Sequence, residues 1–223
     1  MIRLEKLTQK FGDRTLLSAV DLHIAPGAFH FLTGPSGAGK TTLLKLCYGE
    51  IMPSEGQVSL FGDSLVQMDR DQLAHCRRRV GVIHQDCRFL DHLSIADNVA
   101  LPFTAAGKPV PAQDLRELLG WVGLEGQAGA LPPTLSGGER QRAALARAVI
   151  AAPEVVLADE PTGNVDWEMS LRILSLLIEL NRMGTAVLIA THDLNLIRAS
   201  KPQVAARVLR IKDRQLQAAG VDL

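Results

Sequence analysis

Several features that mark other classes of protein are scarce in this sequence of 223 residues. Its three cysteines, Cys47, Cys76 and Cys87, have no CxxC spacing, so we expect reduced cytosolic thiols and no disulfide framework or cysteine-bound metal. No run approaches about 18 uncharged apolar residues, so we expect no helix that crosses a membrane. The first six residues do not resemble a signal peptide. If the protein works at a membrane, another chain is expected to hold it there.

An excess of charge of either sign is also missing. The 24 lysines and arginines balance the 24 aspartates and glutamates, which gives a formal net charge of 0. No basic field indicates a nucleic-acid partner, and we expect none, although a local basic patch is compatible with this composition. The hydrophobic content of 47% is enough for a core, and the length predicts one large domain, alone or with an inserted lobe.

The most informative stretch is a glycine-rich loop that follows the apolar segment 29–33 and precedes a helical pattern. Strand, glycine loop and helix form the context that a phosphate-binding loop needs. An ordinary glycine turn is the alternative, but the pattern in this context is rare by chance. We therefore expect nucleotide binding by this loop, which consists of Gly34, Pro35, Ser36, Gly37, Ala38, Gly39, Lys40, Thr41 and Thr42.

The residue types in this loop suit a phosphate ligand. Its three glycines let backbone N–H groups approach phosphate oxygens, and the N-terminus of the following helix presents further N–H groups and a positive dipole end. Lys40 adds a full positive charge. At ~4 Å and an effective dielectric constant of ~20, each charge pair contributes about 4 kcal/mol before desolvation. Thr41 supplies a hydroxyl that would hold Mg²⁺.

The rest of the first half reads as short strands and a charged helix. Phe11 lies in a polar loop between the first two strands, where its ring could stack on adenine, although an ordinary core aromatic is an equally good interpretation. The arginine run 77–79 is more typical of a solvated helix end than of a site. We expect strands at 2–7, 20–24, 57–61 and 80–83 and a helix at 69–79.

Residues 88–135 differ from the rest of the chain. Their glycines and prolines separate helical patterns, of which Leu115, Leu118, Leu119 and Val122 form one apolar face. We interpret this segment as a helical lobe inserted between two parts of an α/β core, residues 1–87 and 136–223. The second part begins with Ser136, Gly137, Gly138 and Glu139. The serine and glutamate have capping-box spacing, and the two glycines leave the helix N-terminus bare enough for an anion to approach.

Polar residues follow two buried strands in this second part. Asp159 and Glu160 come directly after the apolar segment 155–158, at a strand end where open α/β sheets bind ligands. Asp159 would hold Mg²⁺ and Glu160 would polarise the attacking water; a structural salt bridge is the alternative. His192 follows the strand 187–190. We expect it to contact a γ-phosphate, although a histidine at a strand end is more often satisfied locally. Residues 203–217 predict a closing hairpin.

Together these motifs resemble those of ABC-transporter-type ATPases over essentially the whole chain. The resemblance implies an ABC-type nucleotide-binding domain, with a P-loop RecA-like core, an N-terminal antiparallel β subdomain and an inserted helical lobe. It implies ATP and Mg²⁺ as cofactors and a head-to-tail homodimer, in which each ATP lies between the phosphate loop of one protomer and residues 136–139 of the other. It also implies that Gln85 senses the γ-phosphate and Mg²⁺, and that Asp166 lies at the nucleotide site.

Longer stretches, such as 77–86 and 190–197, resemble the FtsE family of bacterial cell-division ATPases. The resemblance implies an FtsX-like integral membrane partner, indirect coupling to cell-wall hydrolases, and a peripheral position on the cytoplasmic face of the inner membrane at the division site. Three residues depart from the usual pattern without removing a catalytic group: Phe11, where Tyr is common; His84, where Phe is usual; and Val165, where Leu is usual.

Two other functions are alternatives to the division role. Lipoprotein-release and macrolide-export transporters use ATPases with nearly the same motifs. A soluble ABC protein that acts on ribosomes or DNA would have two tandem cassettes, a long coiled coil or zinc cysteines, and the sequence contains none of these.

Overall fold

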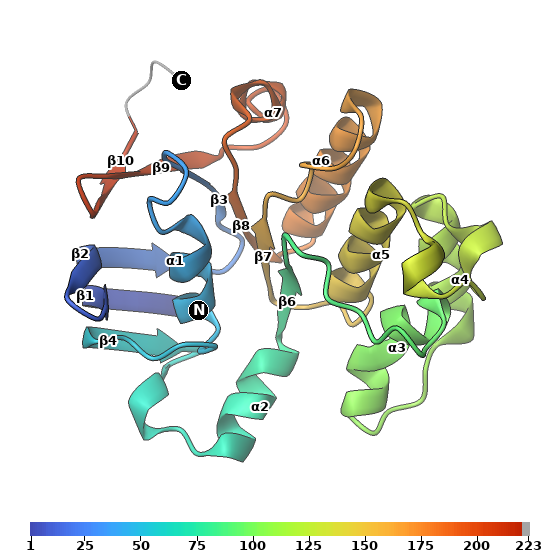
Figure 1. The fold of residues 1–223 in the computed structure, drawn as a ribbon, viewed down its shortest axis with the longest axis horizontal. Helices are drawn as coiled ribbons and strands as arrows, with labels where there is room; N and C mark the ends of the chain where they lie inside the picture. The colour runs from blue at the N-terminus through green and yellow to red at the C-terminus, as the bar shows by residue number, and fades with distance from the viewer. Residues whose placement is uncertain (220–223) are drawn as a thin grey trace.

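A computed structural model describes residues 1–219. Its central feature is a six-stranded sheet in the order β10-β9-β3-β8-β7-β6 (Figure 1). The five strands from β9 to β6 are parallel, and β10 pairs antiparallel with β9. The strands are β3 (Phe29–Thr33), β6 (Val80–Ile83), β7 (Val155–Asp159), β8 (Ala186–Ala190), β9 (Arg207–Lys212) and β10 (Gln215–Ala218). The predicted strands at 29–33, 80–83, 155–158 and 187–190 and the closing hairpin are therefore confirmed.

The central strands are apolar on both faces because helices and a second sheet cover both sides. Every residue of β3, β7 and β8 is buried, as expected for a covered parallel sheet. Val155 and Leu157 of β7 pack in one core with α1 (Lys40–Cys47) and the second sheet. Val156 and Ala158 point to the opposite core, which contains α5 (Gly137–Val149), α6 (Trp167–Arg182) and α7 (Leu194–Ser200). Alternate residues of this strand therefore pack into two different cores, one on each face of the sheet.

The second sheet is antiparallel, in the order β2-β1-β4-β5. The predicted strands 2–7 and 20–24 are too short, because β1 and β2 form one long hairpin that turns at residues 12–13. Irregular register after Leu4 and Leu7 interrupts the apolar alternation on which the prediction depended. Phe11 therefore ends a strand and does not lie in a loop. The strands are β1 (Ile2–Phe11), β2 (Arg14–Ile24), β4 (Glu55–Leu60) and β5 (Asp63–Ser64).

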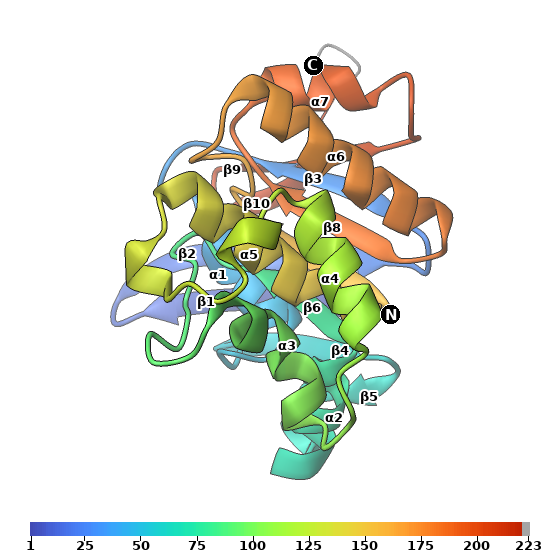
Figure 2. The ribbon, with the colours of Figure 1, turned by 90° about the vertical axis from the view of Figure 1, so that its right-hand side faces the viewer.

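Helices make up most of the segment between β6 and α5. Figure 1 shows α3 and α4 on the opposite side of the molecule from the antiparallel sheet, and in Figure 2 they face the viewer. The predicted apolar face of α4 packs into the second core through Leu119 and Val122, with Leu115 and Leu118 at its edge. The remaining helices are α2 (Arg70–Arg78), α3 (Ile95–Ala105), α4 (Ala112–Trp121) and the 3₁₀ turns Leu65–Gln67, Glu125–Gln127 and Pro132–Thr134. Within residues 1–219, no helix has the length and apolarity that a bilayer crossing requires.

Candidate nucleotide site

A cavity of about 550 Å³ opens at the carboxyl edge of the parallel sheet. β3, β7 and β8 are neighbours and run in the same direction, so the residues that follow them meet at this edge. The phosphate loop follows β3, Asp159 ends β7, and His192 lies two residues beyond β8. The cavity is lined by Leu16, Gly34, Pro35, Ser36, Gly37, Gly39, Lys40, Thr41, Thr42, Gln85, Asp159, Glu160 and His192.

The glycine-rich loop leads directly into the N-terminus of α1. Gly39 is the N-cap residue and has a φ of 105°, a left-handed conformation that glycine adopts without strain. It supplies no side-chain cap, and the first turn of α1 contains no acidic residue. The Lys40 ammonium donates hydrogen bonds to the carbonyl oxygens of Gly34, at 2.9 Å, and Pro35, at 3.3 Å. Free helix N–H groups and a lysine ammonium at one cavity form an anion-binding arrangement.

Asp159 is the deeply buried carboxyl group of the cavity, with 6% of its surface exposed. Burial raises its pKa, and the charge of Glu160 acts in the same direction, whereas a hydrogen bond with the Thr41 side chain and the charge of Lys40 oppose the shift. Thr41, Gln85 and Asp159 line the same cavity and offer only oxygen ligands for a metal. This donor set fits Mg²⁺, which prefers oxygen and usually keeps several ligands from water and phosphate.

Glu160 and His192 lie in contact at the cavity wall. The backbone N–H of Glu160 donates to the carbonyl oxygen of Ala190 at 2.9 Å, which fixes the end of β7 beside the end of β8. Glu160 Oε1 lies 2.8 Å from His192 Nδ1. The Glu160 side chain is 13% exposed and the His192 side chain 77% exposed. The carboxylate thus lies within the cavity wall, while the imidazole is open to a ligand.

The helix N-terminus at residues 136–139 has the predicted capping box. The Ser136 hydroxyl accepts a hydrogen bond from the Glu139 N–H, and the Glu139 carboxylate accepts one from the Ser136 N–H at 2.8 Å. Ser136, Gly137, Gly138 and Glu139 do not line the cavity described above. A Cβ atom on Gly138 would lie 3.1 Å from the Asn164 carbonyl oxygen, so glycine permits α5 to approach the turn after β7.

Two further expected ligand residues lie elsewhere. Asp166 is the N-cap of α6, where its carboxylate accepts a hydrogen bond from the Met169 N–H at 2.8 Å. Phe11 is 54% exposed at the end of β1, whereas Leu16 of β2 lines the cavity. The sequence did not single out Leu16, because an apolar residue within an apolar strand carries no signal of its own.

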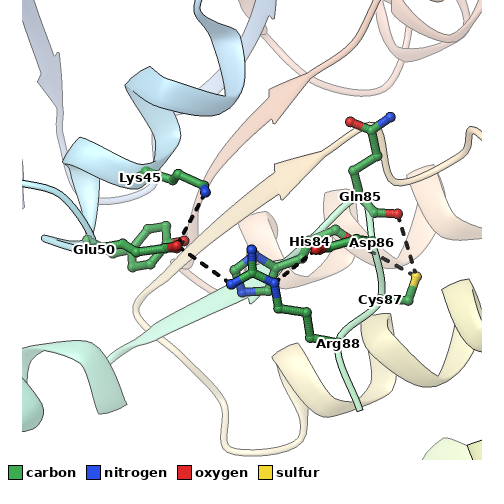
Figure 3. Close-up of polar contacts among 8 residues, drawn as sticks. Lys45, Glu50, His84, Gln85, Asp86, Cys87 and Arg88 are labelled. Atoms are coloured by element: carbon green, nitrogen blue, oxygen red, sulfur yellow. Dashed lines mark hydrogen bonds and ion pairs between the residues drawn. The ribbon is translucent and has the colours of Figure 1, made fainter. Parts of the chain in front are cut away.

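A second group missed by sequence reasoning lies beside Gln85. A second cavity shares three lining residues with the first: Thr41, Gln85 and Asp159. Its other lining residues include the charged Lys45, Asp86 and Arg88. Glu50 forms ion pairs with both Lys45 and Arg88 (Figure 3). The sequence offered no pairing signal, since Glu50 and Arg88 are 38 positions apart and belong to no common motif.

Comparisons with known proteins identify the family of this chain. The family model described as ABC transporter matches residues 17–163. The cell division ATP-binding protein FtsE of Escherichia coli (strain K12) is 45% identical over 202 residues, covering 88% of this chain and 90% of that protein. The FtsE of Mycobacterium tuberculosis is 38% identical, and the alignment covers 100% of this chain and 99% of that protein.

A solved structure has nearly the same fold. The dimeric, post-hydrolysis state of the ATP-binding cassette MJ0796, bound to ADP and Pi, superposes with a TM-score of 0.88 at 32% identity and covers 99% of this chain and 100% of that one. Another dimeric structure of MJ0796, described as a bacterial ABC transporter cassette, gives a TM-score of 0.87 at the same identity.

Proposed function

The chain belongs to the ABC transporter family and is an FtsE-like ATPase, and from this premise we propose that it drives an FtsX-type membrane protein in bacterial cell division. ATP-dependent motion passes through that partner to peptidoglycan hydrolases or their activators on the far side of the membrane, and no solute need cross. The relatives named as cell-division proteins support this function, because they align with 85–100% of this chain.

ATP hydrolysis is supported by one observation: a phosphate loop, two carboxylates and a histidine line the same cavity. In the proposed mechanism the loop and Lys40 bind the phosphates and Glu160 accepts a proton from the attacking water. His192 lies with Nδ1 2.8 Å from the Glu160 carboxylate, and its exposed ring faces the position proposed for the γ-phosphate. Gln85, which lines the same cavity, senses the γ-phosphate.

We propose that Mg²⁺ accompanies the nucleotide, held by Thr41, Gln85 and Asp159. A bound Mg²⁺ would neutralise charge that develops on the phosphate oxygens. The buried position of Asp159 supports this role, because a cation would compensate for the cost of keeping that carboxylate ionised.

We further propose that the working unit is a head-to-tail homodimer with ATP at the interface. Within one chain, the N-terminus of α5 at residues 136–139 lies outside the cavity, although the N–H groups of Gly137 and Gly138, residues without side chains, suit an anion. A second protomer would bring this helix end to the γ-phosphate, with Asp166 nearby. Phe11 would stack against the adenine. The dimers described for MJ0796 support the arrangement.

The test is a pull-down from native membranes in mild detergent, followed by mass spectrometry. The bait is the full chain carrying Glu160→Gln, loaded with ATP, and the matched control carries Lys40→Ala. We expect the first bait to recover an FtsX-like membrane protein with cell-wall hydrolase factors. Recovery of lipoprotein-release or macrolide-export subunits instead would overturn the division role and leave the ATPase chemistry in place.

A further inference from the structure

Two short segments, one of which contains Gln85, lie side by side in the structure. Residues 48–50 follow α1, the helix that begins at the phosphate loop, and residues 84–88 follow β6. Figure 3 shows Glu50 facing Lys45 and Arg88, and Gln85 extending away from this group. Gln85 lines the nucleotide cavity, so contacts that hold its two neighbours also hold its backbone at the cavity.

Glu50 gathers donors from three other residues. Its Oε1 atom lies 3.3 Å from Lys45 Nζ and 3.6 Å from the Arg88 guanidinium, and its Oε2 atom accepts a hydrogen bond from the Tyr48 hydroxyl. Burial alone would raise the pKa of Glu50, but the hydrogen bonds from Tyr48 and Lys45 and the two positive charges lower it below its usual value. The carboxylate is therefore held in its charged form between α1 and the segment 84–88.

Both neighbours of Gln85 contact this group. On one side, Arg88 Nε donates to Asp86 Oδ2 at 2.9 Å, which links Asp86 through Arg88 to Glu50. On the other side, the His84 ring packs edge-on against the Tyr48 ring, with centroids 6.1 Å apart. The backbone N–H of Cys87 closes a turn on the His84 carbonyl oxygen at 3.2 Å. Gln85 thus lies inside a turn whose two ends are tied to residues 48–50.

Hydrogen bonds with α2 and α1 hold the backbone of the segment 48–50 in place. Arg77 of α2 donates from Nε to the Tyr48 carbonyl oxygen at 3.1 Å and from its terminal nitrogen to the Gly49 carbonyl oxygen. The Glu50 N–H donates to the Lys45 carbonyl oxygen at 2.9 Å. One arginine of the run 77–79 therefore holds the backbone that carries Glu50, and so has a structural role that the sequence did not indicate.

The helical lobe holds the far end of the same loop. Asn98, which is fully buried in α3, accepts a hydrogen bond from the Leu90 N–H at 2.9 Å and donates to the Leu90 carbonyl oxygen at 3.0 Å. Cys87 Sγ lies 3.0 Å from Gln141 Oε1 of α5. The loop thus runs from contacts with the phosphate-loop helix to contacts with the lobe, and Gln85 lies at the end nearer α1.

We propose that Glu50 is a positioning residue for ATP hydrolysis, which keeps Gln85 at the nucleotide cavity by joining α1 to the segment 84–88 through Arg88 and Tyr48. This inference rests on the role proposed above for Gln85. Glu50 does not line the nucleotide cavity and acts through the geometry of the loop. Its loss leaves the phosphate loop and Lys40 in place, so ATP binding persists while the hydrolytic step slows.

The test compares Glu50→Gln with Glu154→Gln in the full chain. Glu154 forms a two-point ion pair with Arg79, 2.6 and 3.0 Å long, at the opposite ends of β6 and β7 from the cavity, and so controls for the loss of a comparable ion pair. We expect Glu50→Gln to lower kcat by about one to two orders of magnitude, because small displacements of a positioned group have effects of this size. We expect the KM for ATP to stay within about twofold and the half-saturating Mg²⁺ concentration to rise. Glu154→Gln should change none of these, whatever its melting temperature.

A double-mutant cycle with Gln85→Ala separates the possible explanations. Glu50→Gln should have no further effect on kcat when Gln85 is already alanine. A full additional loss in that background, or an unchanged kcat in Glu50→Gln alone, would overturn the positioning role and leave the ATPase site as proposed. An unchanged kcat in Gln85→Ala would instead overturn the role proposed for Gln85, and with it this inference.

Discussion

The carboxylate of Glu160 and the imidazole of His192 lie 2.8 Å apart, although 32 positions separate them in the sequence. Parallel pairing of β7 with β8 places Asp159 opposite Ala190, and the residues after each strand then meet. Glu160 has a φ of 47°, an uncommon conformation for a residue with a side chain, and its N–H bonds to the Ala190 carbonyl oxygen. Such local strain is typical of functional sites, where surrounding contacts hold a side chain in place.

Replacing Glu160 by glutamine tests the proposed general base. The amide keeps the size of the side chain but cannot accept a proton, so we expect turnover to fall at least about 10²-fold. ATP affinity should be unchanged, because the phosphate contacts come from the glycine loop and Lys40. Phosphate release and calorimetric ATP binding measure the two effects. Glu168→Gln, which removes an exposed carboxylate paired with Arg172, is the control. Normal turnover in Glu160→Gln would remove Glu160 from its role.

Replacing Lys40 by alanine tests the phosphate cradle. The ammonium lies at the loop, where it donates to the Gly34 and Pro35 carbonyl oxygens, and it is the lysine that lines the cavity. Its charge contributes about 4 kcal/mol per phosphate charge at ~4 Å and a dielectric constant of ~20, before desolvation. We expect tight ATP binding to be lost in calorimetry, while Lys108→Ala, an exposed lysine between α3 and α4, binds as the wild type does. An unchanged affinity in Lys40→Ala would contradict the anion-binding role of the loop.

Much of the core could be predicted from the sequence because its signals are local. The strands 80–83 and 155–158 are short apolar runs with turn residues at their ends, and the helix at 137–149 begins at a capping box. The cavity could be anticipated for the same reason: the polar residues follow apolar strands of one α/β core, whose carboxyl ends bind ligands. Local pattern and strand direction were enough to bring Lys40, Asp159 and Glu160 to one edge.

The features that the sequence did not predict depend on long-range or irregular contacts. β1 and β2 are longer than expected because bulges break the alternation that marks a strand. The Glu50–Arg88 contact joins two segments whose charges, in the sequence, resemble those of any solvated loop. No local pattern distinguishes a charged residue that orders a loop from one that merely faces solvent.

The structure also predicts the reactivity of the cysteines. Cys47 is fully buried, and burial raises its pKa to about 12. Burial raises the pKa of Cys76 and Cys87 as well, and both side chains are less than a tenth exposed. Because the thiolate is the reactive form, we expect a disulfide reagent at neutral pH to label the native chain at least about tenfold more slowly than the unfolded chain. Rapid labelling of Cys47 in the native protein would contradict this expectation and point to a redox-sensitive phosphate-loop helix.

Stability should fall as the pH is lowered from neutral, partly because of His30. This residue lies in β3, 7% exposed, and burial lowers its pKa, as do the charges of Arg207 and His23. The unfolded chain therefore takes up a proton near pH ~6.5 that the folded chain resists, so the penalty is absent at higher pH and grows below that value. One such group changes the free energy of unfolding by at most about 1.4 kcal/mol per pH unit.

Urea unfolding at pH 7.5 and pH 5.5 measures this contribution. We expect His30→Gln to lose less stability than the wild type between these two values. Some loss should remain, because burial also lowers the pKa of His84. An equal loss in the variant and the wild type would show that His30 does not titrate on unfolding.

We propose that the complete ATP site contains the cavity of one chain and the α5 N-terminus of a second. Light scattering coupled to size-exclusion chromatography of Glu160→Gln, with and without ATP and Mg²⁺, tests it most directly. We expect ATP to convert the 24.1 kDa chain to a species of twice that mass. Adding Ser136→Arg, which places a large side chain at the α5 N-terminus, should abolish this dimer and leave ATP binding intact. A Glu160→Gln protein that binds ATP and remains monomeric, or a dimer that survives Ser136→Arg, would contradict the shared site.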